Sequence, residues 1–96
     1  MTAVFGELVS LAQEKGPDIR LVVYGDEFYA RYETEDGYSV IYDQNIGLFA
    51  YALLNEGRFV SSGISPDQKP PEGILPHLEE SSEVRQLKAQ TRFSRH

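Results

Sequence analysis

Short apolar runs separated by turn residues recur along residues 7–64 of this 96-residue chain. Gly, Asp and Asn gather between the runs about every ten residues, and these residue types favour tight turns. Turn clusters at such a spacing are typical of strands joined in an antiparallel meander. The pattern predicts an α+β fold: a small antiparallel β meander of about five strands over residues 7–64, followed by a C-terminal helix.

The first two apolar runs, at residues 7–12 and 19–24, are predicted to form a hairpin. Gly16 and Pro17 lie between them, and this pair favours a turn because Gly tolerates positive φ while Pro fixes its own φ. Further strands are expected at residues 38–42, 48–54 and 58–64.

The stretch from Gly25 to Tyr38 fits two periodicities, and its residues 26–34 could be a helix or a strand. Phe28 and Tyr32 share a helical face that Asp26 could cap. The same residues also alternate as in a strand. Strand is favoured because the stretch is rich in aromatic residues and ends in a hairpin-turn signal. The residues of this stretch predicted to form its motif and core are Gly25, Asp26, Phe28, Tyr29, Tyr32, Asp36, Gly37 and Tyr38.

The chain changes character after residue 64. Residues 65–76 are polar and rich in proline, which predicts a loop laid over the surface. Ser81 or Ser82 then caps a helix predicted over about residues 82–93. The length and this order of segments predict a single domain over residues 1–96.

Charge is distributed unevenly, with a total of −6. Residues 1–84 hold 15 acidic and 5 basic residues, a net charge of −10, whereas residues 85–96 hold four bases and no acid, a net charge of +4. An acidic body repels phosphate backbones, so nucleic acid is not an expected partner. The predicted helix has few apolar residues, so we expect acids of its own domain to hold it in part and the tail to join a partner or a downstream domain. The basic residues of this possible interaction tail are Arg85, Lys88, Arg92 and Arg95.

The chain carries no recognisable catalytic, cofactor-binding or metal-binding motif. It has no cysteine, which excludes disulfides, cysteine-based zinc sites and thiol nucleophiles. His77 and His96 stand without companion ligands, and there is no phosphate-binding loop, nucleophile elbow or His-Glu-x-x-His sequence. We therefore expect no enzyme activity, cofactor or metal site in this chain.

Two clusters in the central part of the chain have both a functional and a structural interpretation. Paired acids serve glycoside hydrolysis, but turn formation and solvent exposure are the favoured explanation of the five acids. A row of aromatic rings could stack on sugars, although core packing is favoured in a chain without Trp. The acids are Asp26, Glu27, Glu33, Glu35 and Asp36, and the rings are Phe28, Tyr29, Tyr32, Tyr38, Tyr42, Phe49 and Tyr51.

No apolar run approaches the ~20 residues that span a bilayer, so a membrane is not an expected partner. Residues 1–6 lack the basic and apolar regions of a secretory signal. The expected location is the cytoplasm, unless the chain is a part of a secreted protein.

Several segments of the chain together carry a family resemblance. They are the run from Gly25 to Thr34, Asp36-Gly37-Tyr38, Tyr51-Ala52, Ser62-Gly63, and His77-Leu78 before a Gln/Arg-rich helix. In these segments the chain resembles the N-terminal domain of immune inhibitor A-type bacterial metalloproteases. The likeness covers the chain from about Gly6 to Arg95, but the zinc ligands and catalytic Glu of that family have no counterpart.

The resemblance implies a noncatalytic N-terminal module that acts as a prodomain, which assists folding of a downstream protease domain or masks it. The alternative is a free-standing adaptor that recruits another protein through a sheet edge or the aromatic face.

Overall fold

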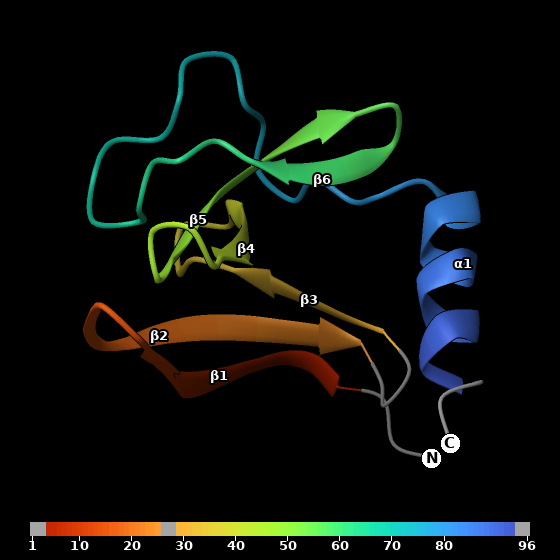
Figure 1. The fold of residues 1–96 in the computed structure, drawn as a ribbon, viewed down its shortest axis with the longest axis horizontal. Coiled ribbons are helices and arrows are strands. Elements are labelled where there is room, and N and C mark those ends of the chain that lie inside the picture. The colour runs from red at the N-terminus through yellow and green to blue at the C-terminus, as the bar shows by residue number, and fades with distance from the viewer. Residues whose placement is uncertain (1–3, 26–28, 94–96) are drawn as a thin grey trace.

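A six-stranded antiparallel sheet followed by one helix makes up the fold (Figure 1). The computed structural model describes residues 4–25 and 29–93. The predicted α+β class with an antiparallel sheet is confirmed, while the strand count of about five is wrong, since the described residues form six. The strands follow one another in sheet order: β1 (Val4–Gln13), β2 (Gly16–Gly25), β3 (Ala30–Glu33), β4 (Ser39–Asp43), β5 (Leu48–Asn55) and β6 (Arg58–Ser61).

The central stretch forms a short strand, as its aromatic content favours. Ala30–Glu33 pairs with β2 along all four of its residues, from Gly25↔Ala30 to Val22↔Glu33. The strand interpretation is therefore right for residues 30–33, and Asp26 and Phe28 lie outside the described residues. Pairing with β2 determines that these residues form a strand and not a helix, because it provides backbone hydrogen-bond partners that local periodicity does not reveal.

The first hairpin turns earlier than predicted. Its turn consists of Glu14 and Lys15, whereas Gly16 and Pro17 already belong to β2. The β1–β2 register shifts between Leu11 and Gln13, so Pro17 lies at an irregular place in the ladder. A bulge of this kind accommodates a residue that has no N–H to donate.

The sheet curls so that the tip of the β1–β2 hairpin reaches the turn between β4 and β5. The Lys15 N–H donates to the Gly47 carbonyl at 3.0 Å, and the Phe49 N–H donates to the Gln13 side chain at 2.8 Å. The two regions are separated by β3 in sheet order, so these bonds require strong curvature. The curl encloses a small core of Leu21, Val40, Phe49 and Tyr51.

The chain that returns after β6 packs on both faces of the sheet, with Ile64 and Ile74 against the core and residues 77–78 against the opposite face. Ser39 donates its hydroxyl to the Leu78 carbonyl at 2.6 Å, and the Ser81 N–H donates to the Gly57 carbonyl at 2.8 Å. Helix α1 (Ser82–Phe93) follows at one side of the molecule, with the bounds that the sequence predicts (Figure 1). Among the described residues, no helix has the length and apolar character needed to cross a membrane.

Gly25 is a position where a side chain cannot be accommodated. Its φ is +133°, and a Cβ built on it would lie 2.1 Å from the Tyr29 carbonyl oxygen. We expect Gly25→Ala to lower the free energy of unfolding by at least ~3 kcal/mol, because β2 and the start of β3 would have to move apart. Urea denaturation measures this change.

Gly73→Ala is the matched control. Its φ is +85°, but a Cβ there meets nothing within 4 Å. It should cost only the ~1 to 2 kcal/mol of the left-handed conformation. Equal losses in the two variants would show that the close approach at Gly25 does not matter.

Candidate functional site

A cleft opens where β3 and β4 separate. These strands pair only at Tyr32↔Val40 and Glu33↔Ser39, and beyond Tyr32 they diverge. The space between them has a volume of about 700 Å³ and is also bordered by the tip of the β1–β2 hairpin, β5, β6 and helix α1.

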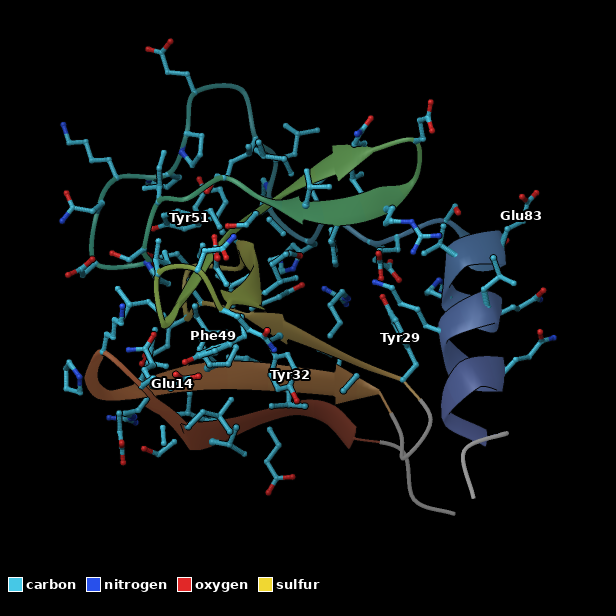
Figure 2. The ribbon with its side chains drawn as sticks, viewed as in Figure 1. Glu14, Tyr29, Tyr32, Phe49, Tyr51 and Glu83 are labelled. Carbon is cyan, nitrogen blue, oxygen red and sulfur yellow. The ribbon has the colours of Figure 1, made fainter. Side chains whose placement is uncertain are left out.

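Aromatic rings form the apolar part of the cleft. Tyr32 and Tyr42 both pack on Phe49, with ring centroids 5.9 Å and 5.2 Å apart and steeply inclined planes. Figure 2 shows Tyr32 and Phe49 close together between β2 and β4. These rings belong to the edge of the core as well as to the cleft, so the predicted core role of the aromatic residues holds for them.

Glu80 forms the polar end of the cleft and is only 2% exposed. Lys88 of α1 donates to both of its carboxylate oxygens, at 2.8 and 2.6 Å. The Tyr29 hydroxyl donates to Oε1 at 2.7 Å and the Phe59 N–H to Oε2 at 2.8 Å. One buried carboxylate therefore joins the residue before β3, strand β6 and helix α1, and Figure 2 shows Tyr29 between the sheet and the helix.

This environment keeps Glu80 ionised and Tyr29 protonated. Burial raises the pKa of Glu80, but the hydrogen bonds from Lys88, Phe59 and Tyr29 outweigh burial and leave that pKa below its ordinary value. Burial, followed by the bond to Glu80, raises the pKa of Tyr29 well above its usual range. Lys88, Tyr29 and Glu80 are thus matched in charge and hydrogen bonding at neutral pH.

A second buried acid, Glu33, corrects the expectation that the central acids face solvent. Glu33 is 1% exposed and forms an ion pair with Arg31, whose guanidinium lies 4.8 Å from the centre of the Tyr24 ring. His77 Nδ1 lies 2.9 Å from Glu33 Oε1. Strand alternation places Glu33 on the face that the returning chain covers, which no local pattern could indicate. Glu35 and Asp36 are exposed at the turn as expected.

The predicted motif residues are distributed over the cleft, its rim and the neighbouring hairpin. Tyr29 and Tyr32 line the cleft, while Tyr38 packs edge-on against Tyr51, with ring centroids 6.0 Å apart. Gly37 is buried beneath the His77 ring, which is 3.0 Å from the place its Cβ would take. Sequence reasoning missed Glu80 and the partnership of Glu33 with His77.

Two basic residues of the predicted interaction tail form ion pairs with acidic residues of the same domain. Lys88 pairs with Glu80, and Arg85 lies 3.6 Å from Glu79. Val84 is the buried apolar residue of the helix, at 7% exposure, whereas Leu87 is 55% exposed. The side chain of Arg92 and all of Arg95 lie outside the described residues.

Within residues 4–25 and 29–93, no three His, Asp or Glu side chains are grouped in a way that could hold a metal ion. Comparisons of the chain with models of protein families, with curated proteins and with solved structures find no match.

Glu80→Gln tests how much the buried carboxylate stabilises the junction of sheet and helix. The variant keeps the shape of the side chain but removes the negative charge to which Lys88, Tyr29 and Phe59 donate hydrogen bonds. We expect the free energy of unfolding to fall by about 2 kcal/mol or more, because hydrogen bonds to a charged group are the strong ones. Hydrogen exchange should accelerate in helix α1 before the sheet.

Glu79→Gln supplies the control, since Glu79 also pairs with a base of α1 but is 54% exposed. Its effect should remain within about 0.5 kcal/mol. A loss as large as that of Glu80→Gln would mean that burial does not distinguish the two acids.

The lowered pKa of Glu80 also predicts a dependence on acid. The unfolded chain takes up a proton near the ordinary carboxyl pKa of 4.5, while the folded chain resists protonation until a lower pH. The contribution of Glu80 is therefore complete above that value and is lost as pH falls through the folded pKa. Urea denaturation from about pH 7 to about pH 3 should show the difference between the wild-type chain and Glu80→Gln shrinking in the acid range. A difference that stays constant would contradict the assignment.

Proposed function

We propose that this chain is a noncatalytic binding module that receives part of a partner protein in the cleft between β3 and β4. The supporting observation is that the cleft joins aromatic rings to the buried Glu80–Lys88 pair, whose charges already neutralise one another. Tyr residues at the rim of an apolar floor are typical of protein-binding surfaces.

The same observation argues against a reaction at this site. A general acid or base works best with a pKa near the working pH and with room for a substrate proton. Glu80 has a lowered pKa and accepts four hydrogen bonds. Two of these come from the Lys88 amine, which donates to both carboxylate oxygens of Glu80. Neither group offers the reactivity that a catalytic carboxylate or amine needs.

The proposed partner is the catalytic domain of an immune inhibitor A-type zinc metalloprotease. The resemblance of the stretch from Gly25 to Tyr38 to the N-terminal domains of that family supports this choice. In this role the module is a prodomain that assists folding of the protease or masks its active site. The alternative function is a free-standing adaptor, which would use the same cleft to recruit a different protein.

A binding experiment with the purified chain tests the proposal. The chain is mixed with an immune inhibitor A-type catalytic domain, and complex formation and peptide hydrolysis are measured together. We expect a stable complex that slows hydrolysis. A masking prodomain makes both changes, whereas an adaptor for another protein makes neither.

Ala30→Trp and Leu75→Trp form the matched pair of variants. Ala30 lines the cleft, whereas Leu75 lies outside it and is 66% exposed. The ring at position 30 should weaken the complex about tenfold or more, a change of about 1.4 kcal/mol, and the ring at position 75 should not. Equal affinities of the two variants would contradict binding in the cleft.

A further inference from the structure

The cleft is bordered by two strand edges that have no partner strand among the described residues. On β3, Ala30 and Arg31 pair with β2 on one side, while pairing with β4 stops at Tyr32↔Val40. On β4, Ile41 and Tyr42 pair with β5 on one side only. Within the described residues, the sheet is thus split over this length.

The hydrogen bonds at the ends of the strands show which backbone groups face the split. The Thr34 N–H donates to the Tyr38 carbonyl at 2.8 Å, so the backbone of Thr34 is directed toward the β4 side. Backbone groups alternate in direction along a strand, so those of Tyr32 and Ala30 are directed the same way. Ala30 therefore presents its N–H and its carbonyl to the cleft.

The backbone groups of strand β4 also alternate between the β5 side and the cleft side. The Asp43 carbonyl accepts a hydrogen bond from the Gly47 N–H at 2.9 Å within the β4–β5 turn, so Asp43 is directed toward β5. By alternation, Ile41 is also directed toward β5, and Tyr42 toward the cleft. The cleft consequently has a backbone donor and acceptor on each side, at Ala30 and at Tyr42.

We propose that the cleft binds an extended segment of the partner polypeptide as an added strand between β3 and β4. This inference rests on the proposed function, since it requires a polypeptide partner, and it specifies how that partner is held. An extended chain can bond to Ala30 on one side and Tyr42 on the other, because its own backbone groups alternate.

The lining of the cleft specifies the side chains of the segment. The rings of Tyr32, Tyr42 and Phe49 favour apolar residues at alternate positions. The charges of Glu80 and Lys88 are already paired, as are those of Arg31 and Glu33. Glu14, at the tip of the first hairpin, adds an exposed negative charge to the lining. The expected occupant is a strand that alternates apolar and small polar residues and carries no acidic residue beside Glu14.

Amide hydrogen exchange followed by NMR tests the inference on the full chain. The probes are peptides of about ten residues that tile the catalytic domain, together with a generic alternating Thr/Val peptide. At saturation, exchange of the Ala30 and Tyr42 amides should slow about tenfold or more, whereas the amides of Arg31 and Ile41, which already face β2 and β5, should not change. This alternation distinguishes an added strand from a peptide held by side chains alone.

Chemical changes on both partners give an independent measure. An ester in place of a central peptide amide removes one N–H without adding bulk, and it should weaken binding roughly threefold to tenfold, with no effect at the peptide ends. Ala30→Pro removes the cleft-facing N–H of β3 and should weaken binding similarly, while Ala30→Ser keeps the N–H and should not. Unchanged exchange at β2 amides shows that Ala30→Pro remains folded.

The outcomes separate this inference from the proposed function. In one outcome, the chain forms a complex with the catalytic domain while the exchange rates of the Ala30 and Tyr42 amides stay unchanged, or while no peptide binds. Either result overturns the added strand but leaves the proposed function. No complex with the catalytic domain, combined with slowed Ala30 and Tyr42 amides in the Thr/Val peptide, overturns the protease partner but supports the added strand. Slowing that depends on the concentration of the chain alone assigns the cleft to a second copy and overturns the inference.

Discussion

The buried carboxylate of Glu80 determines how the parts of this domain are placed relative to one another. An ionised group can be buried only when hydrogen-bonding partners replace the water that it loses. Glu80 takes those partners from the start of β3, from β6 and from α1. The requirement to satisfy one charge therefore fixes three segments that are distant in sequence, and it sets the polar wall of the cleft.

Glu33 has a comparable role on the same face of the sheet. Its carboxylate binds Arg31 of its own strand and His77 of the returning chain, while Ser39 holds the Leu78 carbonyl. Polar contacts thus attach the segment before α1 to a sheet whose central apolar cluster has four buried members among the described residues. A small domain buries little apolar surface, so specific hydrogen bonds have a large share in holding its covering segments.

Local patterns predicted the antiparallel meander and the helix, but not the number of strands, the turn of the first hairpin or the functional features. Turn residues and the capping serine predicted the antiparallel meander and the helix, because both depend on neighbours along the chain. The burial of Glu33 and Glu80 depends on segments more than twenty residues away, so an exposed position was the natural expectation for acids such as Glu33. The place where β3 and β4 stop pairing also leaves no trace in an alternating pattern, which is the same for a paired strand and a free edge.

The split between β3 and β4 follows from the bonds that hold each strand elsewhere. Hydrogen bonds from Lys15 and Phe49 fasten the β4–β5 hairpin to the tip of the first hairpin. Tyr29, at the start of β3, is held instead by Glu80 beside α1. The β3–β4 ladder ends between these two attachments, after Tyr32↔Val40. The proposed strand from a partner would bond to the backbone of Ala30 and Tyr42 and leave both attachments in place.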